Sequence, residues 1–221
     1  MQPAHGNSDR TGWRILIAGT GGQGVLTAAR LLCDRFVELG HQVVSGQLHG
    51  MAQRGGAVQS GVIIDGGISP VIPAGRADYV LGCEPAETVR ALPLMSARTT
   101  VYMNTCPVVP FVLTQHAVRG DGPAEYPPLE ELTAALHDVA GRVFTCDATA
   151  AARRAGSGRA LNMVMLGCLL GDGGLPCSPE GFWSGAATRL PPALREINTR
   201  AFWQGVELAG RLAAGRSGVC G

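Results

Sequence analysis

The chain has 221 residues, of which 46% are hydrophobic and 16% are charged, and its formal net charge is +1. This length is sufficient for one sizeable domain with its own hydrophobic core. A net charge so close to zero, without any run of basic residues, gives no general electrostatic reason to bind nucleic acid or an anionic membrane surface.

The sequence shows neither a membrane span nor a secretory signal. The longest apolar runs, such as residues 161–171, are shorter than the roughly 20 residues that cross a bilayer. Residues 1–12 lack the charged start and apolar core of a signal peptide. We therefore expect a cytoplasmic protein with one domain over residues 13–215 and polar tails at 1–12 and 216–221.

The first 46 residues follow a strand, turn, helix, strand pattern. Residues 13–19 form a short apolar run that ends at a glycine, which is typical of a buried strand. Apolar side chains then recur at helical spacing from Val25 to Leu39, and Gly40 stops the helix. A second strand is expected over residues 41–46, which completes one βαβ unit.

An antiparallel excursion is expected to follow. Residues 57–64 alternate like a strand, and "DGG" at 65–67 is a hairpin-type turn signal. Residues 68–73 are the expected return strand.

The rest of the chain alternates strands and helices. Residues 157–171 are almost wholly apolar, so this helix is expected to be buried on several sides. The pattern predicts an α/β fold with an open, mostly parallel Rossmann-like sheet, an antiparallel hairpin excursion and a C-terminal amphipathic helix. The further strands are expected at 77–85, 99–105 and 142–149, and the further helices at 85–95, 126–141, 157–171 and 192–215. The C-terminal helix is expected to pack through Leu194, Ile197, Ala201, Val206 and Leu208.

The seven cysteines are scattered along the chain, and no two have C-x-x-C spacing. An iron–sulfur cluster or a structural zinc site requires clustered thiolates. We therefore expect reduced, mostly buried thiols and no metal site in this chain.

The stretch "GTGGQG" at residues 19–24 fits G-x-G-x-x-G, after a strand and at the start of a helix. Such glycines allow a tight turn and let a phosphate approach the helix N-terminus. They also simply permit close packing of strand and helix. A dinucleotide fold places an acidic residue at the end of the second strand, where this chain reads "VVSGQLHG". A nicotinamide dehydrogenase is therefore disfavoured.

The stretch "HGMAQRGG" at residues 49–56 lies beyond the second strand, where open α/β sheets collect ligands. His49, Gln53 and Arg54 offer a titratable ring, an amide and a cation suited to carboxylate or phosphate. The alternative is a loop in which the arginine braces carbonyl groups and the glycines only start the hairpin. No nucleophile and base stand together at this spacing.

A few other polar residues follow strands. Asn104, Thr105 and Cys106 are expected to cap a turn or line the same crevice, and Asp147 is expected to cap the next helix. His116 and His137 are expected on a loop and on a helix surface.

Four stretches together resemble a known family: "ILIAGTGGQGVLTAARLL", "LHGMAQRGGAVQSGV", "SPVIPAGRADYVLGCEPAETVRAL" and "RALNMVMLG". They are similar to the beta subunits of indolepyruvate ferredoxin oxidoreductase, the gamma-type domain of the 2-oxoacid:ferredoxin oxidoreductases. The resemblance runs from about Ile15 to the C-terminal helix. The pairing of the two glycine motifs is far more specific than either motif alone.

The resemblance implies oxidative decarboxylation of an aryl 2-oxoacid to an acyl-coenzyme A, with electrons passed to ferredoxin. It implies that thiamine diphosphate, Mg²⁺ and iron–sulfur clusters belong to a large partner subunit and that coenzyme A is a cosubstrate. No catalytic residue is then assigned to this chain.

The positions that match the family's motifs are interpreted as a crevice facing the partner's active site, near coenzyme A or the substrate carboxylate. The chain departs from the family at Ala52, where serine is frequent, and at Gly61, where histidine is common, which puts the substrate in doubt more than the fold. The matching positions are Gly19, Gly21, Gly22, Gln23, Gly24, His49, Gly50, Gln53, Arg54, Gly55 and Gly56.

Two alternatives remain open at this point. One is a separate protein that binds a nucleotide or flavin through residues 19–24. The other is a family member recruited to another pathway, because the partner decides the chemistry.

Overall fold

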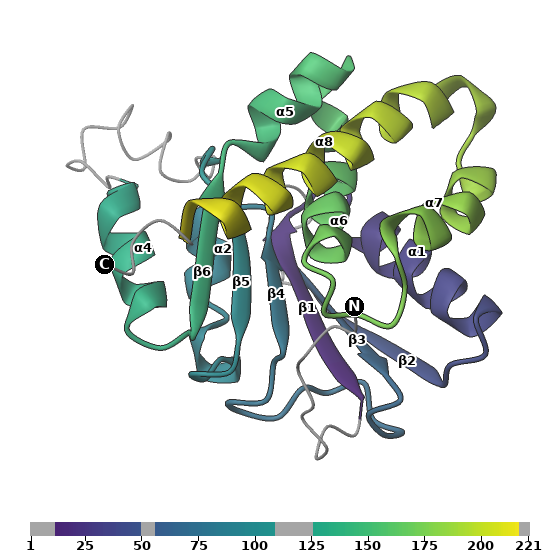
Figure 1. Ribbon diagram of the computed structural model, residues 1–221. Coiled ribbons are helices and arrows are strands. Elements are labelled where there is room, and N and C mark those ends of the chain that lie inside the picture. Colours follow the sequence, from purple (N-terminus) through teal and green to yellow (C-terminus); the bar gives the residue numbers. More distant parts are fainter. Residues whose placement is uncertain (1–11, 50–55, 109–125, 217–221) are drawn as a thin grey trace.

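The computed structural model describes residues 12–49, 56–108 and 126–216 (Figure 1). Within these ranges the strands form one sheet in the order β2-β3-β1-β4-β5-β6. Strand β3 is antiparallel to both β1 and β2, and β1, β4, β5 and β6 are parallel. The strands are β1 (Trp13–Thr20), β2 (Val43–His49), β3 (Ala57–Ile64), β4 (Tyr79–Gly82), β5 (Thr100–Asn104) and β6 (Arg142–Cys146).

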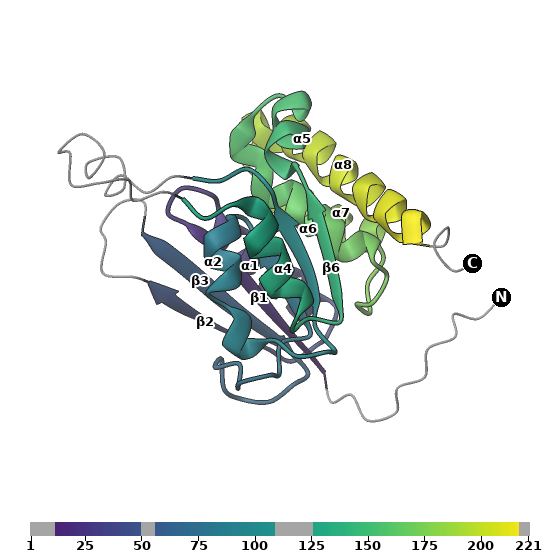
Figure 2. The ribbon, with the colours of Figure 1, turned by 90° about the vertical axis from the view of Figure 1, so that its left-hand side faces the viewer.

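Helices cover both faces of this sheet. Helices α2 and α4 lie on one side, and α6, α7 and α8 lie on the other (Figure 2). The mostly parallel open sheet between helical layers confirms the predicted fold class. The helices are α1 (Val25–Glu38), α2 (Pro85–Val89), α4 (Leu129–His137), α5 (Ala148–Ala155), α6 (Leu161–Gly171), α7 (Pro179–Ala186) and α8 (Pro192–Arg216), with short 3₁₀ turns at Leu92–Leu94, Gly158–Ala160 and Ala187–Arg189.

The apolar helix α6 forms the centre of the larger core, as its composition predicts. Every side chain from Leu161 to Leu170 is buried. Helix α6 lies between the sheet and α8 (Figure 1). The two helices approach closely because glycines face each other: a Cβ on Gly167 would lie 2.0 Å from the Phe202 carbonyl oxygen. This approach fixes the position of the α6 N-terminus.

The predicted return strand at 68–73 is wrong. Strand β3 instead pairs with β2 on one side and with β1 on the other, so both of its edges are occupied. Pro70 and Pro73 have no N–H to donate to a ladder, which disfavours a strand over this segment. The antiparallel excursion is therefore real, but its hairpin is β2–β3, and residues 50–56 connect the two strands.

The C-terminal helix is where predicted, but its packing positions are only partly right. Ala201 is buried, whereas Leu194 is 50% exposed and its prediction is wrong. Residues 191–196 are all exposed, so the first turn of α8 makes little contact with the core. Phe202 and Ala209, which were not predicted, are buried instead. Ile197, Val206 and Leu208 are partly buried and pack against the core as expected.

Two helices, α5 and α7, were not predicted as separate elements. Among the helices of the described residues, none has both the length and the hydropathy needed to span a membrane.

Candidate functional site

The glycine motif forms the turn between β1 and α1 at the carboxyl end of the parallel strands. Gly22 and Gly24 have φ angles of 95° and 77°, which L-residues with side chains rarely adopt. Gly24 is the N-cap residue of α1 and supplies no side-chain cap. The turn thus requires glycine at these two positions for backbone reasons alone.

Gln23 fills the inside of this turn. Its Oε1 accepts a hydrogen bond from the Thr20 amide at 2.8 Å, and its Nε2 donates to the Cys83 carbonyl at 3.0 Å. A Cβ on Gly19 would lie 2.6 Å from the Gln23 Oε1. Gln23 therefore connects the glycine turn to the end of β4, and Gly19 makes room for it.

Asn162, at the start of α6, closes the other side of the turn. Its Nδ2 donates to the Gly24 carbonyl at 3.1 Å, and a Cβ on Gly24 would lie 2.4 Å from that nitrogen. Asn162 is 5% exposed. Sequence reasoning missed this residue, although it is the single polar side chain within the apolar run 161–171, which was a usable signal.

The turn also contacts the second motif directly. The Gly21 amide donates to the Gly56 carbonyl at 3.0 Å. His49 is the last residue of β2, and it is the register partner of Val58 in β3. The "HGMAQRGG" stretch therefore begins at the carboxyl end of β2 and ends at Gly56, next to the start of β3. Gln53, Arg54 and Gly55 lie outside the described residues, as does Gly50.

Asn104 organises the neighbouring strand ends. It is fully buried, and its Nδ2 donates to the Cys83 carbonyl at 3.0 Å, to the Cys106 carbonyl at 3.2 Å and to the Thr149 hydroxyl at 3.1 Å. The Thr105 amide donates to the Cys146 carbonyl. These hydrogen bonds stabilise the turn after β5, which agrees with the first of the two roles expected for these residues, capping a turn. Because Gln23 and Asn104 share the Cys83 carbonyl, both belong to one network.

The expected cap of the next helix is confirmed. The Asp147 side chain accepts from the Ala150 amide at 2.7 Å. His137 is exposed in the last turn of α4, as predicted, and His116 lies outside the described residues.

Glu84 is a second polar residue that sequence reasoning missed. It is 1% exposed and caps α2 by accepting from the Glu87 amide at 2.9 Å. Its other oxygen accepts from the Tyr126 hydroxyl at 2.5 Å and from the Val108 amide at 3.3 Å. A glutamate directly before Pro85 at a helix start was the available signal. Glu84 thus ties residues 108 and 126 to the end of β4.

The titratable groups here are not arranged for nucleophilic chemistry. Burial raises the pKa of the Cys83 thiol to about 12, so this sulfur stays protonated near neutral pH. Burial also raises the pKa of the Glu87 carboxyl. Within the described part of the chain, no group of three or more metal-ligating side chains gathers.

Three amides of the glycine turn already donate hydrogen bonds within the protein. The amides of Thr20, Gly21 and Gln23 all donate to protein oxygens. A phosphate loop needs such amides free and pointing at the ligand. The turn is thus better suited to hold α1, β4 and the β2–β3 hairpin in register than to cradle a diphosphate.

Comparisons with known proteins agree with this arrangement. The model of the pyruvate ferredoxin/flavodoxin oxidoreductase family matches residues 14–208. The indolepyruvate oxidoreductase subunit IorB of Methanothermobacter thermautotrophicus is 38% identical over 193 residues, which cover 87% of this chain and 95% of that subunit.

Solved structures support the fold. The gamma subunit of a keto/oxoacid ferredoxin oxidoreductase from Geobacter sulfurreducens superposes with a TM-score of 0.62 at 23% identity, covering 90% of this chain and 99% of that one. A 2-oxoglutarate:ferredoxin oxidoreductase from Magnetococcus marinus gives a TM-score of 0.65 at 17% identity, covering 92% of this chain but only 32% of that one. In the second case the matching fold is one part of a longer chain.

Proposed function

The chain belongs to the pyruvate ferredoxin/flavodoxin oxidoreductase family, and on this basis we propose that it is the accessory subunit of a 2-oxoacid:ferredoxin oxidoreductase of the indolepyruvate type. The complex oxidatively decarboxylates an aryl 2-oxoacid to an acyl-coenzyme A and passes the electrons to ferredoxin. The observation that carries this proposal is the 38% identity to an IorB subunit over 95% of that subunit's length.

Under this proposal a large partner subunit carries thiamine diphosphate, Mg²⁺ and the iron–sulfur clusters, and this chain contributes one domain over residues 13–215. This division is what family membership suggests, and the iron–sulfur and thiamine chemistry is assigned to the partner on that ground. The chain's own residues then serve to position and shape the shared site.

The glycine turn and the β2–β3 connection form the surface that this chain presents to the partner's active site. Gln23 and Asn162 hold the turn, and the Gly21 to Gly56 hydrogen bond fixes one end of the connection. Arg54 then has the chemistry to hold the carboxylate of the substrate or a phosphate of coenzyme A.

Reconstitution tests this function. The chain and its large partner are purified separately, and ferredoxin reduction is measured with indolepyruvate and coenzyme A. We expect turnover from the mixture and none from this chain alone. Turnover of indolepyruvate by the isolated chain would contradict the accessory role.

The alternative of a separate nucleotide- or flavin-binding protein is disfavoured because the amides of Thr20 and Gly21 already donate to the Gln23 side chain and to the Gly56 carbonyl. A yellow preparation, or a thermal shift with FAD, FMN or NAD(P)H, would revive it. Recruitment to another pathway would appear as a reconstituted complex that is active with a different 2-oxoacid.

A further inference from the structure

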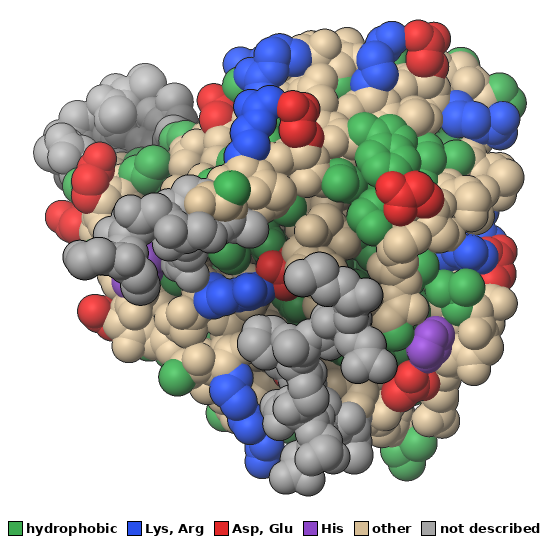
Figure 3. Space-filling view, viewed as in Figure 1, with side chains coloured by type: hydrophobic (Ala, Val, Ile, Leu, Met, Phe, Trp, Pro, Cys, Tyr) green, Lys and Arg blue, Asp and Glu red, His purple; other side chains and the backbone are tan. Residues whose placement is uncertain are grey.

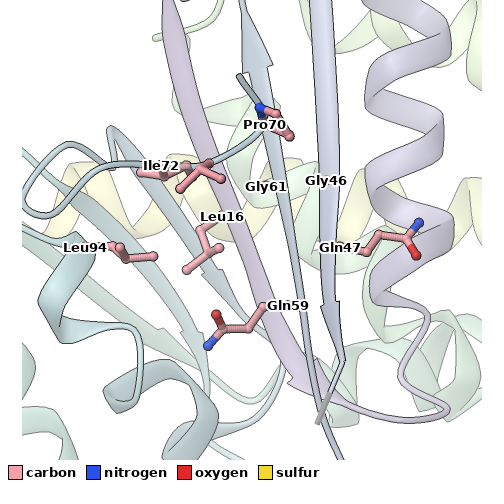
Figure 4. Close-up of a pocket in the computed structure, with 9 residues that line it drawn as sticks. Leu16, Gly46, Gln47, Gln59, Gly61, Pro70, Ile72 and Leu94 are labelled. Atoms are coloured by element: carbon pink, nitrogen blue, oxygen red, sulfur yellow. The ribbon is translucent and has the colours of Figure 1, made fainter. Parts of the chain in front are cut away.

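The two edges of the sheet differ in what they leave reactive. At the β2 edge, Pro70 packs on Gly46 and Ile72 packs on Gly61, so the chain's own side chains cover the strands there (Figure 4). On the face of the molecule that α8 crosses, arginine and acidic side chains of the described residues are interspersed (Figure 3). Beside the other edge strand, β6, two cysteines from different elements meet.

These two cysteines are Cys146 and Cys168. Cys146 is the last residue of β6, and Cys168 lies in the second half of α6. Alternate residues of a strand share a face, so Cys146 lies on the same face as Phe144, which belongs to the core around α6. The Cys168 thiol donates a hydrogen bond to the Cys146 sulfur. The two sulfurs are therefore direct neighbours in the fold.

The surroundings of the two thiols are unequal. Cys168 is fully buried, whereas Cys146 is partly exposed at the end of its strand. The hydrogen bond from Cys168 lowers the pKa of the Cys146 thiol. The same hydrogen bond, together with burial, raises the pKa of the Cys168 thiol. Cys146 therefore forms the reactive thiolate more readily, and Cys168 stands behind it as a protonated thiol.

This inequality is typical of a redox-reactive pair. Cysteines that respond to oxidants are accessible, have a lowered pKa and lie next to a second thiol that captures the oxidised sulfur. Both sulfurs are free thiols in this structure. Two other partly exposed cysteines, Cys33 and Cys177, differ from Cys146 because burial raises their pKa values. Cys146 is thus the thiol among these three that is set up to react.

We propose that Cys146 and Cys168 form a dithiol pair that hydrogen peroxide oxidises to a disulfide and that a thiol reductant restores. The Cys146 thiolate attacks the O–O bond of the peroxide, which gives a sulfenic acid on Cys146 and releases hydroxide. The Cys168 sulfur then attacks the Cys146 sulfur, the S–O bond breaks, and the hydroxyl group leaves with the Cys168 proton as water. The two thiols supply the two electrons that the peroxide takes up.

The pair stops oxidation at a reversible stage. A sulfenic acid without a neighbouring thiol is oxidised further to sulfinic and sulfonic acids, which thiol reductants do not restore. The disulfide also joins two elements that border the candidate site, because the Cys146 carbonyl accepts from the Thr105 amide and Asn162 of α6 holds Gly24. The assignment rests on the contact between the thiols and is independent of the proposed function.

Peptide mapping of the full chain tests the pair. The reduced chain is exposed to hydrogen peroxide, blocked with iodoacetamide and digested with trypsin. We expect the peptide of Cys146 to be linked to the peptide of Cys168 and to be released by dithiothreitol. Cys168 and Cys177 share one tryptic peptide, so the mapping is repeated in Cys177→Ser, which should form the same disulfide. Free thiols at both positions after the treatment, or a disulfide from Cys146 to Cys106 or Cys177, would overturn the proposal.

Matched variants test the role of each sulfur. Cys168→Ala should leave Cys146 as a sulfenic acid that dimedone captures, and excess peroxide should then oxidise it beyond recovery by dithiothreitol. Cys177→Ala is the control and should recover as the parent chain does. Cys146→Ala should leave Cys168 as a free thiol, because Cys168 is fully buried.

Irreversible oxidation of Cys146 as fast in the parent chain as in Cys168→Ala would show that Cys168 does not capture the sulfenic acid, and it would overturn the proposal. These measurements need only the full chain and no partner subunit. Failure of the reconstitution assay therefore leaves them unaffected, so the two proposals fail separately.

Discussion

The amide of Gly21 donates to the carbonyl of Gly56 at 3.0 Å and joins the two glycine motifs, which are 35 positions apart in the sequence. The bond places the end of the "HGMAQRGG" stretch against the turn before α1. The pairing of motifs that identifies the family thus corresponds to a physical contact. Gly56 and the turn before α1 therefore lie together at the carboxyl ends of the parallel strands.

Substitution of the turn glycines is expected to cost stability in a defined order. Gly22→Ala adds a Cβ in open space at a φ of 95°, so only the backbone cost of about 1–2 kcal/mol applies. Gly24→Ala adds the clash with Asn162 and should cost more. Urea denaturation measures both. Gly210→Ala, in open space on α8, is the control and should stabilise by about 0.5–1 kcal/mol. If the two variants lose the same free energy of unfolding, the Asn162 side chain moves aside to accommodate the alanine at position 24.

Gln23 is expected to behave as a two-bond connector. Gln23→Glu keeps an acceptor for the Thr20 amide but cannot donate to the Cys83 carbonyl when ionised. Gln23→Leu loses both hydrogen bonds and leaves the Thr20 amide and the Cys83 carbonyl without these partners. Each unpaired group is expected to lower the free energy of unfolding by about 1–3 kcal/mol if it stays buried. We expect the stability order Gln, then Glu, then Leu, measured by thermal denaturation. A leucine variant as stable as the parent chain would show that the turn needs no such connector.

The local sequence pattern predicted some elements of the fold but not how all of the strands pair. The apolar run 161–171 has no hydrophilic face, so the sequence alone predicted that α6 is buried on all sides. The partners of β3 did not follow, because strand pairing depends on which edges are free in three dimensions. A "DGG" turn signal predicts a reversal but does not say that residues 68–73 run across the sheet.

In the candidate site, too, some residues could be predicted from the sequence and others could not. Gly22 and Gly24 were identifiable because positive φ angles favour glycine. Asn162 and Glu84 were missed because their partners are far apart in sequence: Asn162 binds the carbonyl of Gly24, and Glu84 accepts from Tyr126. Such long-range side-chain contacts leave no periodic signal.

A buried tyrosine in β5, Tyr102, is expected to make the stability of the fold sensitive to alkali. Burial, with the nearby Asp172 carboxylate, raises the pKa of the Tyr102 phenol, whose hydroxyl donates to Asp172 at 2.9 Å. The folded state therefore keeps this proton above pH 10, whereas the unfolded chain releases it. The stability is present below the ordinary tyrosine pKa of about 10 and falls as the pH rises above it, by about 1.4 kcal/mol for each pH unit.

Tyr102→Phe tests this prediction. The variant should lose stability less steeply than the parent chain between pH 9.5 and 11, although it is less stable at pH 8 because Asp172 loses a donor. Denaturant unfolding at several pH values gives both slopes. Parallel slopes would mean that Tyr102 ionises normally in the folded protein.

Asp65 is expected to contribute a small acid-labile stabilisation. The hydrogen bond from the His41 ring at 2.6 Å lowers the pKa of the Asp65 carboxyl. A lowered pKa gives stability that is present above the ordinary aspartate pKa of about 3.9 and is lost as the pH falls through the folded value. Asp65→Asn should flatten the stability curve below pH 4, and asparagine tolerates the φ of 53°. Asp138→Asn, exposed at the end of α4, is the control. If the dependence of stability on pH is the same in Asp65→Asn as in the parent chain, the His41–Asp65 hydrogen bond does not stabilise the fold.

Arg54 is expected to matter for the complex and not for the fold. It lies in the connection whose ends are anchored by the β2–β3 ladder at His49 and by the Gly21 to Gly56 hydrogen bond. Arg54→Ala should lower reconstituted turnover at least tenfold, roughly the loss of one charge-assisted hydrogen bond, at an unchanged melting temperature. Arg54→Lys should retain only part of the parent turnover, because an ammonium group lacks the planar guanidinium fork that binds a carboxylate or phosphate at two points. Arg98→Ala, exposed at the amino edge of the sheet, should leave turnover unchanged. If Arg54→Ala and Arg98→Ala behave alike, the arginine only braces its own loop, and recognition of the substrate or coenzyme A must lie with the partner.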